Sequence, residues 1–310
     1  MRRALVAGGA GFIGSHLVEA LLAKRHEVVV VDDFSSGLRS NLSAVASRIS
    51  IVEADAADFS SDGSFDVIYN LASNASRADW EKHPVKVALS NAEGSRNLLQ
   101  LSTKSGAQYV YASSSEIYGN PRIVPTPEDY VGEVSSIGTR SPYDEGKRFG
   151  EALAKSYERE FHVPVMVLRI FNTYGPRMSQ GIYGRVIERF ISQASKGQPL
   201  TVYGDGSQTR SFTYVTDVVA GMMVAAEYGK VGGVYNIGSD QEVRISDLAR
   251  LVLSSMGRSL PLEYHPLPPD DPARRSADIT KIRQLGWSPK VNLEDGLRAM
   301  VRSFHDAPPS

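Results

Sequence analysis

A glycine-rich turn near the amino terminus constrains the fold of this chain more than any other feature. Residues 8–14 read Gly-Gly-Ala-Gly-Phe-Ile-Gly, directly after an apolar, strand-length run at 4–7 and before a helical pattern at 12–24. Glycines at such a junction allow a tight turn, close packing of the helix on the strand, and close approach of a pyrophosphate to backbone N–H groups. The turn therefore predicts a strand–turn–helix unit that binds a dinucleotide.

Two aspartates after the next predicted strands bear on the identity of this dinucleotide. Asp32 follows the apolar run at 28–31, eighteen positions after Gly14. A carboxylate at this place accepts hydrogen bonds from ribose hydroxyls and repels a 2′-phosphate, which favours NAD over NADP. Asp55 follows the third predicted strand, where it either reaches the adenine edge or lies in a solvated turn.

Strand-length apolar runs alternate with amphipathic segments through the first half of the chain. Strands are expected at 4–7, 28–31, 49–53, 67–71, 109–112 and 163–169, and long helices at 12–24, 84–105 and 141–161. Runs that are apolar at most positions are typical of strands buried on both faces. The alternation predicts an α/β fold built on a doubly wound parallel sheet of the Rossmann type.

Shorter elements separated by glycine-rich turns follow residue 172. Helices are expected at 186–196, 245–255 and 293–304, and a strand at 199–203. We interpret 1–172 as the dinucleotide-binding core. Residues 173–310 form mainly a smaller α/β lobe for the substrate, interleaved in sequence with late core elements around 210–240.

Composition excludes several classes of protein. With 34 Lys+Arg against 35 Asp+Glu, the chain has no basic field for nucleic acid or for an anionic membrane surface. It has no cysteine, and its 6 histidines lack metal-ligand spacing, so neither a disulfide framework nor a metal site is expected. No apolar run approaches the roughly 20 residues that cross a bilayer. We therefore expect a cytoplasmic protein without a metal.

Tyr143 and Lys147 form the clearest candidate for a catalytic pair. Positions i and i+4 share one face of the predicted 141–161 helix, so the ammonium can lie near the phenol oxygen. Lowering a phenol pKa from about 10 to about 7 requires roughly 4 kcal/mol, to which a lysine and a nicotinamide cation would contribute. Such a pair also occurs on ordinary helix surfaces. The order of these residues along the chain favours a catalytic site. Ser114 and Glu116 follow a predicted strand, and the carboxyl ends of such strands form the sheet edge where ligands bind.

The chain resembles the extended short-chain dehydrogenases/reductases that act on nucleotide sugars, over nearly its whole length. Besides the glycine turn and the Tyr143/Lys147 pair, the resemblance rests on Arg169-Ile170-Phe171-Asn172 and on Gln208-Thr209-Arg210-Ser211-Phe212. It implies that Tyr143 is the base, that Lys147 supports it, and that Ser114 shares the sugar hydroxyl. It also implies NAD as cofactor, bound by Gly8, Gly11, Phe12, Ile13, Gly14, Asp32, Asp33, Gly37, Asp55, Ala56, Leu71, Ala72, Asn91, Tyr143 and Lys147.

The same resemblance implies a UDP-sugar substrate. Its nucleotide diphosphate would be bound by Asn172, Arg185, Arg210 and Arg275, with Tyr203 beside the nucleotide base. A doubly charged diphosphate in a neutral protein needs a few buried arginine side chains, which agrees with this set.

Within the family, the UDP-glucuronate decarboxylase subgroup is most similar. Shared segments lie at 114–119, 127–130 and 143–148, at Ile137-Gly138 with Arg140, and at Asp271-Pro272 with Arg275. The chain departs from the subgroup at Val124-Pro125-Thr126, at Ser135-Ser136 and at Ser276-Ala277. The resemblance implies decarboxylation of UDP-glucuronate to UDP-xylose through a 4-keto sugar, with Glu116 near C5 and C6.

Other functions remain open at this point. A UDP-glucuronate or UDP-glucose 4-epimerase needs only the base, the serine and room for the ketone to rotate. A 4,6-dehydratase is disfavoured because Ser115 stands where that group carries aspartate. An NAD-binding regulatory module would not need Ser114, Tyr143 and Lys147 together.

A homodimer is also expected, through the helices at 84–105 and 141–161. In the family these helices pair with their counterparts in a second subunit. Six apolar residues lie beyond one buried stripe on these helices: Val87, Leu98, Leu101, Phe149, Leu153 and Tyr157.

Overall fold

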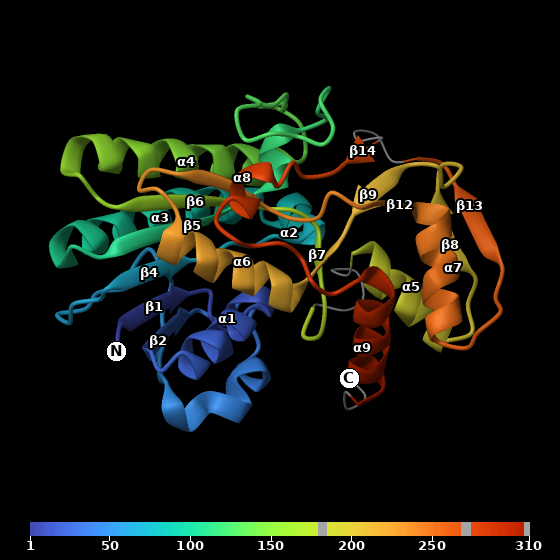
Figure 1. Cartoon of the computed structure of the whole chain (residues 1–310), viewed down its shortest axis with the longest axis horizontal. Coiled ribbons are helices and arrows are strands. Elements are labelled where there is room, and N and C mark those ends of the chain that lie inside the picture. The colour runs from blue at the N-terminus through green and yellow to red at the C-terminus, as the bar shows by residue number, and fades with distance from the viewer. Residues whose placement is uncertain (179–184, 268–273, 307–310) are drawn as a thin grey trace.

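A parallel sheet forms the centre of the structure. The computed structural model describes residues 1–178, 185–267 and 274–306, and within them seven strands pair in the order β11-β6-β5-β4-β1-β2-β3 (Figure 1). The strands are β1 (Arg3–Ala7), β2 (Glu27–Asp32), β3 (Ser50–Glu53), β4 (Val67–Asn70), β5 (Gln108–Ser114), β6 (Val165–Ile170) and β11 (Val234–Ile237). The prediction of a doubly wound α/β sheet is confirmed.

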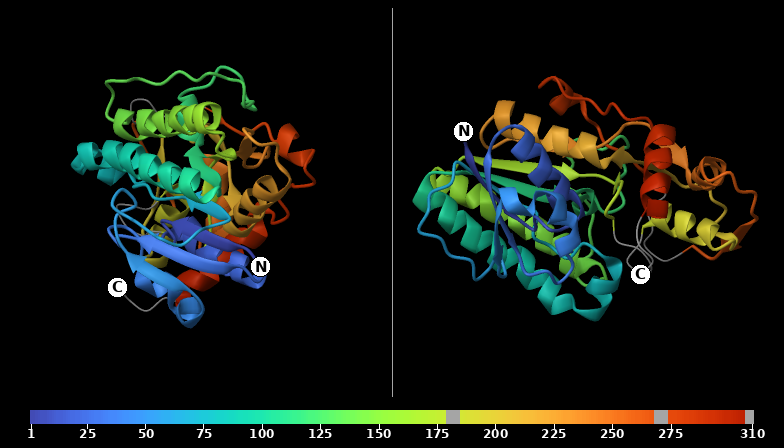
Figure 2. Two further views of the ribbon diagram at one scale, coloured as in Figure 1. Left: turned by 90° about the vertical axis from the view of Figure 1, so that its left-hand side faces the viewer. Right: turned by 90° about the horizontal axis from the view of Figure 1, so that it is seen from below.

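Helices cover both faces of this sheet, which explains why most of its strands are apolar at most positions. Helices α3 (Pro84–Ser105) and α4 (Ser141–Phe161) pack on one face, while α1 (Phe12–Ala23) and α6 (Val215–Tyr228) pack on the other (Figures 1 and 2). Strand β3 differs from the expectation of full burial, because all four of its residues are exposed. It pairs only with β2 and forms the edge of the sheet.

The helices predicted from sequence begin and end close to the observed residues. Helix α3 begins at Pro84, where the missing N–H costs no hydrogen bond, and ends before Gly106, whose φ of 68° is left-handed. Helix α4 also has a proline in its first turn. The structure adds the short elements η1 (Arg39–Arg48), α2 (Arg77–Lys82) and η2 (Ser115–Tyr118).

A smaller lobe lies beside the carboxyl ends of the strands, at the right of Figure 1. Its core joins α5 (Val186–Ser195), α7 (Ile245–Ser255) and α9 (Leu293–Asp306) to β8 (Leu200–Tyr203), which pairs with β13 (Leu262–His265). Its other elements are β7 (Thr173–Tyr174), β9 (Thr209–Ser211), β10 (Thr213–Tyr214), β12 (Glu242–Arg244) and β14 (Arg274–Arg275), whereas α8 (Thr280–Arg283) packs against β11 of the central sheet.

The chain returns from the lobe to the sheet through α6 and β11, as expected for residues around 210–240. The division at residue 172 itself stays a prediction. Across the described ranges, no helix combines the length and apolar character needed to cross a membrane.

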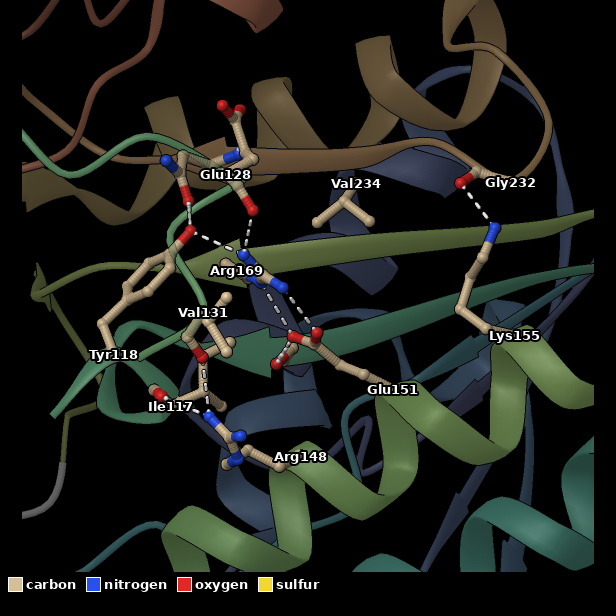
Figure 3. A network of polar contacts seen from close by, with 12 residues as sticks. Ile117, Tyr118, Glu128, Val131, Arg148, Glu151, Lys155, Arg169, Gly232 and Val234 are labelled. Carbon is tan, nitrogen blue, oxygen red and sulfur yellow. Dashed lines mark hydrogen bonds and ion pairs between the residues drawn. The ribbon is translucent and has the colours of Figure 1, made fainter. Parts of the chain in front are cut away.

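A buried polar network fastens α4 to the sheet behind the strand ends. Arg169 of β6 donates to both carboxylate oxygens of Glu151, at 3.0 and 2.8 Å, and also to the Tyr118 hydroxyl and the Glu128 carbonyl oxygen (Figure 3). The Ser113 hydroxyl donates to the same Glu151 carboxylate. The network therefore holds α4 against the end of β5, where the candidate catalytic residues lie.

Candidate active site

The glycine turn has the tight geometry that its sequence predicts. Gly8 has a φ of 77°, and a Cβ there would lie 2.8 Å from backbone atoms of Leu71 and Ala72. A Cβ on Gly14 would overlap the carbonyl oxygen of Gly8. No side chain fits at either place, so the turn leaves its N–H groups at the amino end of α1 close to any bound phosphate.

Asp32 lies at the end of β2, against this turn. Its carboxylate accepts hydrogen bonds from the backbone N–H groups of Ala10, at 2.8 Å, and of Phe34, at 2.9 Å. Burial raises the pKa of Asp32, while the two N–H donors act in the opposite direction. The aspartate therefore organises the turn itself, and a second acceptor site on each carboxylate oxygen is available to a ribose hydroxyl.

Two adjoining cavities run from this aspartate to the catalytic pair. One contains Asp32 and the other contains Tyr143 and Lys147, and both are lined by Gly8, Gly11 and Leu71. All the residues predicted to bind NAD line one of the two cavities, except Asn91. A continuous cleft with a carboxylate at one end and the tyrosine at the other fits an extended dinucleotide.

Asn91 lies behind this cleft. It is buried in α3, donates to the Val87 carbonyl oxygen at 2.9 Å, and packs against Gly146 of α4. In the described part of the chain, no group hydrogen-bonds with its side-chain oxygen. Asn91 thus supports the helix that carries the catalytic pair, and its direct contact with NAD stays a prediction.

The structure brings together the residues predicted for chemistry. Tyr143 and Lys147 share the buried face of α4, with the Lys147 ammonium 5.8 Å from the centre of the Tyr143 ring and 2.8 Å from the Ala112 carbonyl oxygen. The Ser114 side chain hydrogen-bonds with Tyr143. Trp80 stacks on the other side of Tyr143, with ring centres 4.7 Å apart. The phenol is therefore held in one orientation at the end of β5.

Burial changes the proton affinity of both members of the pair. It raises the pKa of the Tyr143 phenol, although the hydrogen bond with Ser114 acts in the opposite direction. It also lowers the pKa of Lys147 to about 7, because an ammonium is poorly solvated there. Any lowering of the phenol pKa therefore depends on the positive charge of the nicotinamide, which the sequence analysis named together with Lys147.

Glu116 lies at the centre of a charged cluster. It forms ion pairs with Arg140, at the start of α4, and with Arg275 of β14. Arg140 also lies 3.7 Å from the carboxylate of Asp144. Arg275 thus lies beside Glu116, which lines the cleft that also contains Ser114 and Tyr143, and its contact with the nucleotide diphosphate stays a prediction.

The other predicted substrate residues lie along the lobe. Asn172 and Arg185 line the cleft beside Tyr143. Arg210 is buried in β9, where it donates to the Thr209 carbonyl oxygen at 2.8 Å. Tyr203 is half-buried in β8 under the guanidinium of Arg189. Contact of these residues with a nucleotide diphosphate stays a prediction.

The departures from the decarboxylase pattern fall in two places. Thr126 and Ala277 pair with each other as a β-bridge, and both are fully buried together with Ser276. Ser135 instead lines a third cavity next to Glu116. The departures at 124–126 and at 276–277 therefore contact each other inside the protein. Ser135 is the departure that lies beside the candidate sugar site. Asp271 and Pro272 lie outside the described residues.

Sequence reasoning missed Trp80, Arg140 and Asp144 as site residues. Trp80 is one of only 2 tryptophans, but nothing in its neighbourhood along the chain connects it to Tyr143. Asp144 directly follows Tyr143 in the sequence, and this adjacency could have identified Asp144 as a candidate site residue.

Comparison with known proteins agrees with this geometry. Residues 4–238 match the model of the NAD dependent epimerase/dehydratase family. The chain belongs to this family. Because members of this family depend on NAD, the prediction of NAD as the cofactor is confirmed. The family resemblance inferred from the sequence is also confirmed.

Individual relatives are similar over almost the whole chain. UDP-glucuronic acid decarboxylase 2 of Arabidopsis thaliana is 43% identical, over 97% of this chain and 68% of its own length. The structure of UDP-glucose 4-epimerase from Thermotoga maritima with UDP-glucose has a TM-score of 0.90 at 32% identity, covering 98% of this chain and 99% of that one. UDP-glucuronic acid 4-epimerase from Bacillus cereus, in complex with UDP-glucuronic acid and NAD, has a TM-score of 0.88 at 32% identity over the same shares.

A buried glutamate beside Arg185 yields a prediction about stability. Glu188 is 1% exposed and accepts a hydrogen bond from the Arg185 N–H at 2.6 Å, and burial raises its pKa to about 8. The folded protein therefore binds more protons than the unfolded chain between about pH 4 and 8, and the Glu188 contribution to stability falls as pH rises through this window.

Glu188→Gln keeps a hydrogen-bond acceptor and removes the buried charge. We expect it to stabilise the protein by about 1–3 kcal/mol at pH 8, and the gain to vanish near pH 4. Urea unfolding at both pH values measures this difference. Glu160→Gln, at an exposed position of the same charge, serves as the control. An equal effect of Glu188→Gln at the two pH values would contradict the burial argument.

Proposed function

We propose that the protein is an NAD-dependent UDP-glucuronate decarboxylase that forms UDP-xylose. The observation that carries the proposal is Glu116 with its two arginines at the end of the cleft that holds Tyr143. These arginines offer cations to a carboxylate on C6 of a sugar whose C4 hydroxyl meets the phenol. The similarity to UDP-glucuronic acid decarboxylases over 97% of the chain supports the same substrate.

The proposed chemistry begins at the sugar C4 hydroxyl. Tyr143 removes its proton, and Ser114 donates a hydrogen bond to the same oxygen. NAD, held by the residues that line the cleft, would supply the hydride acceptor for oxidation at C4 and the hydride donor for the later reduction of the ketone. The resulting 4-ketone makes the C6 carboxylate a β-keto acid, so carbon dioxide can leave with its bonding electrons delocalised into the ketone oxygen. Ser114 and Tyr143 stabilise that oxygen by hydrogen bonds.

UDP-glucuronate 4-epimerase is the second candidate, favoured by the likeness to the Bacillus cereus enzyme. Both reactions share the first step and differ in whether the carboxylate is lost. Decarboxylation needs the C5–C6 bond aligned with the ketone π system, whereas epimerisation needs space for the ketone to rotate.

Proton NMR of a reaction with UDP-glucuronate separates the two functions. We expect signals of UDP-xylose and no net accumulation of NADH, because the hydride returns to the product. A galacto-configured uronate that keeps its carboxylate would favour the epimerase instead. Turnover of UDP-glucose without turnover of UDP-glucuronate would show that the substrate carboxylate was wrongly inferred.

We also propose that the protein is a homodimer, assembled through the layer that α3 and α4 form on one side of the sheet. Three of the residues predicted for this contact, Val87, Leu98 and Leu101, are instead buried inside the subunit. Side chains of Val85, Leu89, Phe149 and Phe161 on the two helices are exposed and apolar. These four support a contact with a second copy.

A charge in this surface should prevent assembly. Phe149→Glu would bury a carboxylate in an apolar contact, so we expect light scattering to give a dimer mass for the natural protein and a monomer mass for the variant. Val231→Glu, at an exposed apolar position outside the two helices, should remain dimeric. A monomeric natural protein at micromolar concentration would contradict the proposal.

A further inference from the structure

Decarboxylation has a proton requirement that epimerisation lacks. When the C5–C6 bond breaks, its electron pair passes into the enolate at C5, C4 and the C4 oxygen, and carbon dioxide leaves. The enolate must then take one proton at C5. Tyr143 removes and returns the C4 hydroxyl proton, so it contributes none in balance. One solvent proton is therefore consumed in each turnover, and it must reach C5 inside the cleft.

A third cavity, separate from the two that form the cleft, leads from the protein surface to Glu116. Its volume is about 380 Å³, far above the roughly 10–15 Å³ that one water requires. Asn120 and Ser135 at its lining are exposed, whereas Asp144 and Arg275 are buried. Among the described residues, Glu116 alone lines both this cavity and the cleft that contains Tyr143.

Asp144 is a carboxylate in this cavity to which the chemistry proposed above gives no role. The residue is 6% exposed, and one of its oxygens, Oδ1, has no hydrogen-bond partner in the ranges that the structure describes. Its other oxygen lies 3.7 Å from Arg140, which is also paired with Glu116. The two carboxylates are thus joined through one guanidinium and face the same solvent-connected space.

We propose that this cavity is the proton-entry route for the decarboxylation, and that Asp144 relays solvent protons to Glu116 and on to C5. The inference rests on the proposed decarboxylase function. Arg140 and Arg275 hold the two carboxylates in place, because an arginine side chain stays protonated and cannot pass the proton itself. Asp144 acts as a relay and positioning residue and does not touch the sugar.

The charges around Asp144 suit such a relay. Burial raises its pKa to about 6, and Arg140 and Arg275 act against this shift, while Glu145 adds to it. Glu116 and Glu133 are the further acidic groups at the cavity lining. Asp144 therefore takes up and releases protons near neutral pH, and the protonation step should slow as pH rises above about 6.

Rapid mixing of UDP-glucuronate with the NAD-loaded enzyme tests the relay. The rise in absorbance at 340 nm reports oxidation at C4, and its decay reports protonation and return of the hydride. For Asp144→Asn we expect the rise within about two-fold of the natural enzyme, and the decay and UDP-xylose formation at least about ten-fold slower. The fall of the decay rate above about pH 6 should be lost as well.

Two further variants make the result specific. Glu160→Gln removes a charge from an exposed position of α4 that does not line the cavity, and it should behave as the natural enzyme. Ser135→Phe narrows the outer part of the cavity without changing Asp144 and should also slow the decay. An Asp144→Asn enzyme that loses the rise and the decay equally would show a structural role and overturn the relay.

The same measurements distinguish failure of the relay from failure of the proposed function. UDP-xylose formation by the natural enzyme, with a normal decay in both Asp144→Asn and Ser135→Phe, would overturn the relay and leave the decarboxylase intact. Formation of UDP-galacturonate by the natural enzyme would overturn both, because no solvent proton is then consumed.

Discussion

Replacing Tyr143 with phenylalanine is expected to lower the turnover of UDP-glucuronate by about 10²–10⁴-fold, the usual contribution of a general base. The phenol hydroxyl is the group that meets the C4 hydroxyl, and phenylalanine keeps the ring that stacks on Trp80 at 4.7 Å. The change therefore removes proton transfer while leaving the packing of α4 in place. Initial rates of UDP-xylose formation measure the loss.

Two observations make this result interpretable. The melting temperature of Tyr143→Phe should stay close to that of the natural enzyme, because the ring and its packing on Trp80 are kept. Tyr264→Phe, at an exposed position of β13, should keep full turnover. Turnover of Tyr143→Phe near the natural rate would exclude Tyr143 as the base, and with it the mechanism proposed above.

Removing the Arg169 guanidinium should cost about 3–5 kcal/mol of folding stability, as expected when one partner of a buried ion pair is lost. In Arg169→Leu the Glu151 carboxylate remains largely buried, and the Tyr118 hydroxyl and the Glu128 carbonyl oxygen lose a donor (Figure 3). The penalty comes from the uncompensated charge more than from the lost attraction. Urea unfolding followed by circular dichroism measures it.

An exposed ion pair provides the matched control. Arg298 and Glu294 lie 3.5 Å apart with more than half of each side chain exposed, so Arg298→Ala should cost less than about 1 kcal/mol. The double variant Arg169→Leu/Glu151→Leu should recover part of the loss, since it removes both buried charges. Equal losses in Arg169→Leu and Arg298→Ala would show that the buried network does not stabilise the fold.

Local patterns in the sequence were sufficient to predict the architecture and the placement of Tyr143 and Lys147 on one helix face. The glycine turn, the alternation of strands and helices, and the limits of α3 depend on residues within a few positions of one another. Tyr143 and Lys147 meet because i and i+4 share one face of any helix. Such features follow from backbone geometry and side-chain periodicity, and the structure changed none of them.

Which apolar side chains are buried depends on how the helices and strands pack, and the sequence alone did not determine this packing. Strand β3 has an apolar pattern but lies exposed at the sheet edge. Val87 and Leu98 seemed free for a second subunit, yet they pack inside their own subunit. Periodicity identifies an apolar position, but only the neighbouring layers decide whether that position is covered.

The charged end of the site was decided by tertiary structure alone. Glu116 meets Arg140 and Arg275 across 24 and 159 positions of sequence, and Trp80 reaches Tyr143 from a separate helix. Parallel strands bring segments distant in sequence to one edge of the sheet, and the lobe adds β14 there. The amino-acid sequence by itself determined the fold class and the dinucleotide turn, and it placed the candidate base, Tyr143, on one helix face with Lys147. The tertiary structure determined which charges surround the sugar carboxylate, because ion pairs between distant segments have no local periodicity to read.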